Sequence, residues 1–282
     1  MVFQQIINGI IIGSSYSLVA LGLNLIWSIT DIPDFSQGGI YIIAAYTGYF
    51  AVKLANVPFP VAILLGMCAG AAIAFCFERF LYRRWTGKGR IQLLSAIALF
   101  FLLANLAILM WTAKAKFFPT YLPGSVSLFG FMVSYQRIVV LAVSAILFVL
   151  VYLFIQRTKI GKAIRAASQD REAAEVVGIN MSTVYSMVFM IGGALSGTAA
   201  VLISPLYSVF PTMGELPLLK SLVVVVLGGF GSVAGVLVGG IGLGLLESLG
   251  AVYISAAYQH GFAFFILIIV LLFFPRGLFG KV

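Results

Sequence analysis

The chain has 282 residues, of which 62% are hydrophobic and only 9% are charged. Soluble domains carry roughly 25% charged residues, so this composition excludes a soluble globular protein. It predicts an all-α, polytopic membrane protein with about eight transmembrane helices, in a range of roughly seven to nine. A β-barrel is not expected, because runs such as 91–109 are apolar on all sides and do not alternate. The net charge of +9 lies mostly in short loops beside apolar runs, which favours an orientation signal over nucleic-acid binding.

Apolar runs separated by charged or proline-containing breaks predict the spans in chain order. They cover residues 6–29, 38–54, 61–82, 93–113, 138–155, 184–203 and 262–274. A further apolar stretch, 218–249, is too long for one comfortable span and contains Gly228, Gly229 and Gly231 near its first third. It is interpreted either as a short half-helix followed by a full helix or as one kinked helix, and the count of crossings favours a break at 228–231.

Lys and Arg set the expected orientation. Positive residues cluster in 83–90 and 157–171, and short loops rich in Lys and Arg stay in the cytoplasm. The segments 114–135 and 207–217 are therefore expected outside, together with the N-terminus. The basic end at 275–281 is expected inside.

Several polar and glycine residues inside the apolar runs allow two interpretations of their role. Ser14, Ser17, Asn24 and Ser28 recur at helical spacing and form a stripe that must face protein or a wet cavity. Close helix packing is the favoured reading, and a translocation path is the alternative. The GxxxG steps in 231–244 likewise favour tight packing inside one subunit, with a subunit interface second.

Charged and reactive residues within the apolar runs are few. Lys220 and Glu247 are expected near a membrane boundary, with their long side chains extended to the interface. Cys68 and Cys76 show no CxxC pattern and no Cys/His cluster, so both are expected in the core, and neither a disulfide nor a metal site is expected. Paired intramembrane carboxylates, which a proton relay needs, are missing from the sequence.

The segment 157–183 is the only sizeable stretch that resembles a soluble protein. Ser168 is a candidate N-cap of a short helix with Asp170 in its first turn, Gly178 is expected just past its end, and Ser182 is expected to cap the next span. Such a helix suits a soluble docking partner; the alternative is an ordinary loop on the lipid headgroups. The chain contains no GxxxxGK[ST] pattern, so ATP would be bound by a partner subunit.

The same segment carries a family resemblance. Glu172-Ala173-Ala174 followed by Gly178 resembles the EAA-x-x-x-G core of ABC-importer permeases, and the flanking residues 158–163 and 178–180 resemble the LivH-like branched-chain amino-acid permeases. Residues 13–23, 211–214, 226–232 and 275–280 are similar to other parts of that family. Two departures exist: the usual I-x-L-P ending is missing, and residues 34–38 read Asp-Phe-Ser-Gln-Gly where the family commonly has N-F-A-H-G.

The resemblance implies one transmembrane permease domain over 1–282, with 157–183 as its cytoplasmic coupling segment, in the inner membrane of a bacterium. It implies partners: ATPase subunits that bind ATP, a second identical or homologous permease, a periplasmic solute-binding protein and membrane lipid. The chain itself is then neither an enzyme nor a cofactor or metal binder. The implied ATPase-coupling residues are Arg165, Asp170, Glu172, Ala173, Ala174 and Gly178. The candidate translocation-path residues are Ser14, Ser17, Asn24, Ser36 and Gln37.

Two alternatives remain open from the sequence. The same class of importer can carry urea or short amides, because the permease path places few chemical demands on the chain. A stand-alone secondary transporter with a helix broken at 228–231 is the alternative from another class.

Overall fold

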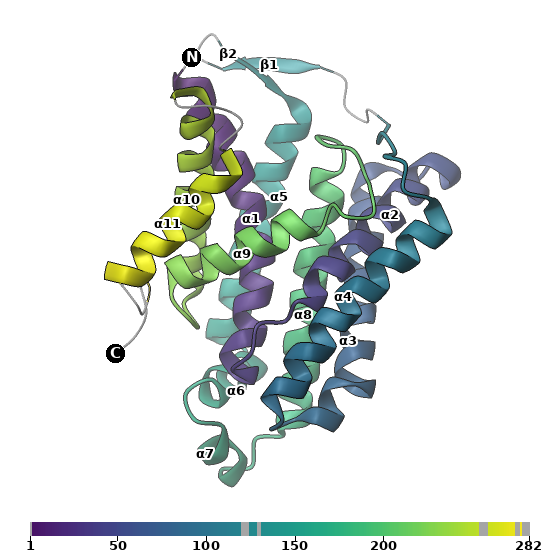
Figure 1. Ribbon diagram of the computed structural model, residues 1–282. Helices are drawn as coiled ribbons and strands as arrows, with labels where there is room; N and C mark the ends of the chain where they lie inside the picture. Colours follow the sequence, from purple (N-terminus) through teal and green to yellow (C-terminus); the bar gives the residue numbers. More distant parts are fainter. Residues whose placement is uncertain (1, 120–123, 129–130, 254–258, 274–276, 278–282) are drawn as a thin grey trace.

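The structure is a computed structural model that describes residues 2–119, 124–128, 131–253, 259–273 and 277. Within these residues the chain is a bundle of α-helices with one short 3-10 helix and one β-hairpin (Figure 1). Seven helices in the described part of the chain are long and apolar enough to cross a membrane. They are α1 (Val2–Thr30), α2 (Ser36–Ala55), α3 (Phe59–Phe80, continued by the 3-10 helix Tyr82–Trp85), α4 (Gly89–Trp111), α5 (Tyr135–Arg157), α8 (Met181–Ile203) and α10 (Val233–Tyr253).

The remaining elements are short. They are β1 (Ser125–Leu128), β2 (Phe131–Ser134), α6 (Lys159–Ala167), α7 (Arg171–Val176), α9 (Glu215–Gly228) and α11 (Gln259–Phe273). With 14 and 15 residues, α9 and α11 are about 21–23 Å long, less than the hydrocarbon thickness of roughly 30 Å. The predicted polytopic all-α fold is confirmed, whereas the antiparallel hairpin β1–β2 in the 114–135 connection was not predicted.

Local sequence signals account for the helix ends. α1 ends at Asp31, whose φ of 58° leaves the helical region, and Pro33 follows. α2 ends on Asn56, which adopts the left-handed conformation (φ 49°) that Asn tolerates better than most residues. Pro60 lies in the first turn of α3, where its missing N–H has no helical partner to lose.

The glycine-rich stretch breaks the long apolar run, as predicted. α9 stops at Gly228, and Gly229 and Gly231 have φ values of 86° and 75°, a region in which a side chain would be strained. The run is therefore a short helix followed by a membrane-length helix. In Figure 1 the short helix α9 runs obliquely to the long helices.

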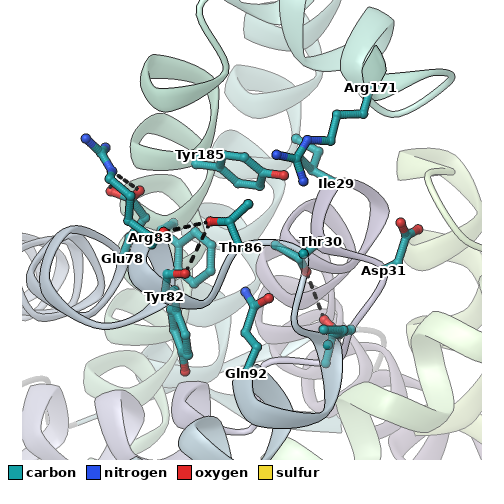
Figure 2. Close-up of a pocket in the computed structure, with 14 residues that line it drawn as sticks. Ile29, Thr30, Asp31, Glu78, Tyr82, Arg83, Thr86, Gln92, Arg171 and Tyr185 are labelled. Atoms are coloured by element: carbon teal, nitrogen blue, oxygen red, sulfur yellow. Dashed lines mark hydrogen bonds and ion pairs between the residues drawn. The ribbon is translucent and has the colours of Figure 1, made fainter. Parts of the chain in front are cut away.

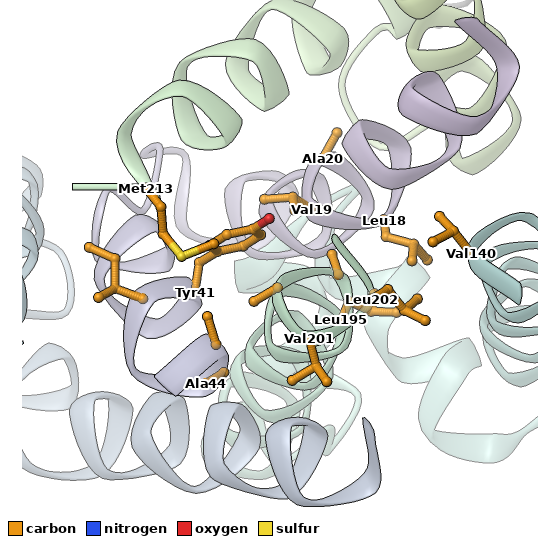
Figure 3. Packing of buried hydrophobic residues seen from close by; sticks show 14 of the residues in the cluster. Leu18, Val19, Ala20, Tyr41, Ala44, Val140, Leu195, Val201, Leu202 and Met213 are labelled. Carbon is orange, nitrogen blue, oxygen red and sulfur yellow. The ribbon is translucent and has the colours of Figure 1, made fainter. Parts of the chain in front are cut away.

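The core lies around α1, which is buried from Ser17 to Ile26. Figure 3 shows Leu18 of α1 beside Leu202 of α8 and Val140 of α5, and Val19 of α1 beside Tyr41 of α2. The outer faces of α3, α4 and α5 instead expose large apolar side chains, and Leu109 is 84% exposed. An exposed apolar face of this extent suits contact with lipid.

Cys68 and Cys76 lie on such a face of α3 and not in the core, so that prediction was wrong. Both lie on α3, where the inward positions are taken by small residues such as Gly66, Gly70 and Ala74. An added Cβ on Gly70 would lie 2.1 Å from the Gly193 carbonyl oxygen of α8. The close approach of the two helices leaves room only for glycine and alanine at these positions.

The glycines of α10 serve close packing within the chain. Cβ atoms on Gly240 and Gly244 would clash with Ser17 and Gly9 of α1, at 2.0 and 2.3 Å. A Cβ on Gly235 would lie 2.0 Å from the carbonyl oxygen of Gly228. The favoured reading of the GxxxG steps, tight packing inside one subunit, is confirmed at these positions.

The two basic segments lie at one end of the bundle, where Arg83 of the first and Arg171 of the second line the same pocket. Arg83 donates to the Ser182 carbonyl at 3.3 Å and to the Ser186 hydroxyl at 3.0 Å. At the other end, Lys116 and Val209 form an antiparallel bridge between the two segments expected outside. The relative placement of the loops agrees with the predicted orientation. The basic C-terminal end at 275–281 lies outside the described residues, apart from Gly277.

Candidate functional site

The predicted coupling segment forms two short helices at the basic end of the bundle, α6 and α7 (Figure 1). Each has a side-chain cap. The Thr158 hydroxyl accepts a hydrogen bond from the Gly161 N–H at 2.9 Å, and the Asp170 carboxylate accepts one from the Ala173 N–H at 3.0 Å. Such caps satisfy N–H groups that have no partner within the helix.

Two predicted caps were wrong. Ser168 ends α6 and donates to the Arg165 carbonyl, while Asp170 is the N-cap of α7. Asn180, and not Ser182, caps α8 by accepting from the Thr183 N–H at 3.3 Å. In both cases an Asx residue two positions from the predicted serine takes the role and accepts a hydrogen bond from the N–H three residues on.

The turn after α7 needs a glycine. Gly178 has φ 87°, and an added Cβ would meet nothing within 4 Å. The constraint at this position is therefore backbone strain and not space within the chain. The expected left-handed residue at the helix end is confirmed, and it redirects the chain into α8.

The six predicted coupling residues have different environments. Glu172 and Ala173 are exposed, whereas Ala174 is buried against the bundle. Arg165 donates to the side chain of Gln156 at the end of α5. Ala174 thus anchors α7, and the side that carries Glu172 is left open.

The coupling segment ends in an apolar tip. Val176 is 87% exposed and Val177 is 76% exposed, at an end of the molecule that otherwise carries charged residues. Leaving the apolar surface of two adjacent valines in contact with water is unfavourable relative to burying it. The sequence indicates a docking helix with alanines and valines on one side, whereas the structure buries Ala174 and exposes both valines.

A polar network joins this end of α8 to α3. Glu78 is buried and forms an ion pair with Arg83 at 3.1 Å, and it accepts a hydrogen bond from Ser186 at 2.7 Å. Arg171 of α7 lies over the Tyr185 ring of α8, 5.3 Å from its centre. Figure 2 shows these groups around a pocket of about 340 Å³ between the ends of α1, α3, α4 and α8.

The polar stripe of α1 faces protein. The Ser17 hydroxyl donates to Gly13 within the helix at 2.9 Å and lies 3.4 Å from the Val236 carbonyl of α10. The Asn24 side chain accepts from the Gly231 N–H at 3.0 Å. Ser14 bonds within α1. In this structure the polar stripe therefore packs α1 closely against neighbouring parts of the protein.

Ser36 and Gln37 belong to a buried cluster around Asp34. The Asp34 carboxylate accepts from the Ser36 N–H at 3.0 Å, from Tyr82 at 2.8 Å and from Gln37 at 3.4 Å. Ser196 of α8 donates to Gln37 at 2.5 Å. Burial raises the pKa of the Asp34 carboxyl, and these hydrogen bonds oppose that rise. None of the five predicted path residues lines the pocket of Figure 2 or the pocket beside Lys220 that is described below, and their role in transport stays a prediction.

The charges of the last third are buried inside the protein and do not extend from it. Lys220 and Glu247 are 3% and 1% exposed and form an ion pair at 2.7 Å. The Tyr16 hydroxyl accepts from Lys220 at 2.7 Å and donates to Glu247 at 3.3 Å. The prediction that these side chains extend to the interface was wrong, because the two residues lie on neighbouring helices and neutralise one another.

A second pocket of about 320 Å³ opens beside Lys220. It lies between α1, α2, α9 and the connection 204–214, whose Val209 pairs with Lys116 at the end expected outside. Its walls are mainly apolar, with several tyrosines among them. The chain therefore has one pocket near its basic end and another near the opposite end.

Membrane-length helices, a lipid-suited apolar surface and a small helical segment at a basic end define a multi-pass helical membrane protein. The chain belongs to the family described as branched-chain amino acid transport system / permease component, whose profile matches residues 5–271. The resemblance drawn from the EAA-x-x-x-G pattern is thereby confirmed.

Individual relatives match over nearly the whole chain. The high-affinity branched-chain amino acid transport system permease protein BraD of Pseudomonas aeruginosa is 35% identical over 293 residues, which cover 99% of this chain and 95% of BraD. The corresponding LivH of Salmonella typhimurium is 30% identical over 297 residues, with 99% and 95% covered. Among solved structures, PsaBC from Streptococcus pneumoniae in complex with Fab has a TM-score of 0.51 at 16% identity, covering 96% of this chain and 92% of that one. This last likeness concerns the fold alone.

Proposed function

We propose that this chain is a permease subunit of an ATP-driven importer for branched-chain amino acids, coupled to separate ATPase subunits through α6 and α7. Support for the substrate comes from the family and from relatives that carry this substrate in their names. In this proposal the chain is not itself an enzyme and holds no cofactor, and ATP is bound and hydrolysed by the partner subunits. A second permease and a solute-binding protein complete the importer.

The observation that supports the coupling role is the way in which α7 is anchored and exposed at the end of the bundle. It is anchored by buried Ala174 and presents Glu172, Val176 and Val177 beyond the end of the bundle. An apolar tip beside an acidic side chain fits a groove with an apolar floor and a basic residue at its rim. We infer that each ATPase subunit provides such a groove.

A mechanical route leads from α7 into the membrane. Gly178 joins α7 to α8 through a tight turn, and Arg171 of α7 packs on Tyr185 of α8. Ser186 and Arg83 then connect α8 to Glu78 of α3. A displacement of α7 by the ATPases therefore moves α8 and α3 together, and these two helices are packed too closely at their glycines to slide independently.

The proposal predicts loss of coupling without loss of assembly when this route is disturbed. Gly178→Val places a β-branched residue at positive φ, at a cost of about 1–2 kcal/mol, and Glu172→Lys inverts the charge of the docking face. We expect both variants to reach the membrane and to bind the leucine-loaded binding protein. ATP hydrolysis stimulated by that protein should be lost in the reconstituted complex.

Gly87→Val is the matched control. Gly87 also has positive φ (82°) and open space around a Cβ, and it lies at the same end of the molecule but outside α6 and α7. Stimulated hydrolysis should survive in this variant. Normal stimulation in both Gly178→Val and Glu172→Lys would show that the segment is only a solvated connection.

A further inference from the structure

The pocket beside Lys220 combines an apolar wall with polar groups at one side. Its apolar lining includes Val19 of α1, Met213 and Leu216, and Figure 3 shows Val19 and Met213 next to Tyr41. Tyr207, which is 55% exposed, also lines the pocket, near the Val209 bridge at the outer end. The volume of about 320 Å³ lies at the small end of the range for pockets that bind small molecules.

Two side chains at this pocket have hydrogen-bond donor groups without an acceptor among the described residues. Tyr41 is 2% exposed and lines the pocket, and its hydroxyl makes no hydrogen bond with any residue that the structure describes. An ammonium has three N–H donors, and Lys220 uses two of them, toward Tyr16 and Glu247. Buried donors are normally satisfied, so the third N–H of Lys220 and the hydroxyl of Tyr41 both fit an acceptor inside the pocket.

The charge balance defines the kind of acceptor. Glu247 neutralises Lys220 in a 2.7 Å ion pair, so the polar side of the pocket carries no net charge. A free anion would bring an uncompensated charge into this site, whereas a zwitterion would not. The apolar wall opposite suits an aliphatic side chain.

Resting on the proposed function, we propose that this pocket is a substrate subsite within a single permease chain, which takes an aliphatic α-amino acid. Its carboxylate accepts hydrogen bonds from Lys220 and Tyr41, and its side chain packs against Val19, Met213 and Leu216. The substrate would occupy this subsite after its release from the binding protein at the outer end. The class of ligand is a small zwitterion with a branched or linear hydrocarbon side chain.

Photolabelling of the intact reconstituted complex tests the site directly. The probe is a diazirine analogue of leucine, activated by light, with labelled peptides identified by mass spectrometry. We expect adducts on the peptides that contain Val19, Met213 or Leu216, and we expect excess leucine to suppress them. Adducts that leucine does not suppress would mean that lipid occupies the pocket, and labelling confined to other peptides would place the substrate elsewhere; either result would overturn the proposal.

Two variants of one helix provide the matched comparison. Tyr41→Phe removes the hydroxyl aimed at the ligand, and loss of one hydrogen bond should reduce adduct yield at subsaturating probe by about 3-fold to 10-fold. Tyr46→Phe makes the same change on α2 at a hydroxyl that is also buried and unpartnered among the described residues but does not line the pocket. Its yield should equal that of the wild type. Equal yields in the two variants would contradict the assignment of Tyr41.

Filling the pocket gives an independent check. Leu216→Trp places a larger ring at a lining position, while Leu246→Trp makes the same change at a comparably exposed position of α10 that lies outside the pocket. Only the first should abolish leucine-suppressible labelling. Leucine uptake by the wild-type complex separates the two proposals: uptake without pocket labelling would refute only the subsite, and absence of uptake would refute the proposed function.

Discussion

Two oppositely charged residues are buried together with a tyrosine inside the helical bundle. Tyr16, Lys220 and Glu247 come from α1, α9 and α10 and meet in one buried cluster. The sequence revealed each charge but not the pairing, because the separation of 27 positions between Lys220 and Glu247 gives no periodic signal. Their contact depends on the turn at Gly228–Ser232, which brings α10 back beside α9.

The ion pair predicts an asymmetry between single and double substitutions. Lys220→Met leaves Glu247 buried without its partner, which should lower the free energy of unfolding by about 3–5 kcal/mol. Lys220→Met combined with Glu247→Gln removes both charges and should be close to the wild type. Denaturant unfolding of the purified chain in detergent measures the difference. A double variant at least as unstable as the single one would refute the interpretation of the pair as mutually neutralising.

At the scale of the elements, glycines determine which helices touch. The sequence showed glycine spacing in α10 and correctly favoured packing inside the chain, but it did not identify α1 as the partner. Gly9 and Gly13 of α1 meet Gly244 and Gly240 of α10 with their backbones in contact. Likewise, the sequence predicted the break at 228–231, whereas the hairpin β1–β2 arises from four-residue strands too short to give a clear alternating pattern.

Two neighbouring glycines of α10 test this packing. Gly244→Val would place a Cβ 2.3 Å from the Gly9 carbonyl oxygen, and the clash with backbone should prevent α1 and α10 from closing. Gly242→Val adds the same side chain to the same helix where a Cβ meets nothing within 4 Å. We expect the first variant to yield little monodisperse protein by size-exclusion chromatography and the second to behave like the wild type. Similar yields from both would show that α1 and α10 do not pack through this face.

For the whole molecule, the distribution of charge and the arrangement of the helices indicate the same orientation of the chain in the membrane. Apolar runs predicted the membrane-length helices to within a few residues, because helix length and hydropathy are local properties. The lower hydropathy of α1 compared with the lipid-facing helices α4 and α5 agrees with its buried position, but hydropathy does not identify the helices that surround it. The candidate site was predicted in part: Gly178 and the buried stripe of α1 were correct, whereas the caps of α7 and α8 were each misplaced by two residues.

Thiol labelling tests the orientation. Single cysteines at Thr86 and Ser168, in a background with Cys68 and Cys76 replaced by alanine, should resist a membrane-impermeant maleimide on intact cells. Both positions should react after the membrane is permeabilised. A cysteine at Thr212, in the connection expected outside, serves as the accessible control. Rapid labelling of Thr86→Cys or Ser168→Cys on intact cells would reverse the assigned sides of the membrane.

The central claim is that this chain imports branched-chain amino acids only as part of an ATP-driven complex. The direct measurement is uptake of radiolabelled leucine into proteoliposomes that contain the complex captured through a tag on this chain. The binding protein is supplied outside, and ATP is enclosed inside. The account predicts uptake that requires both, stops with enclosed vanadate and persists when a proton ionophore collapses ion gradients. Vanadate-insensitive uptake by this chain alone, driven by an ion gradient, would contradict it.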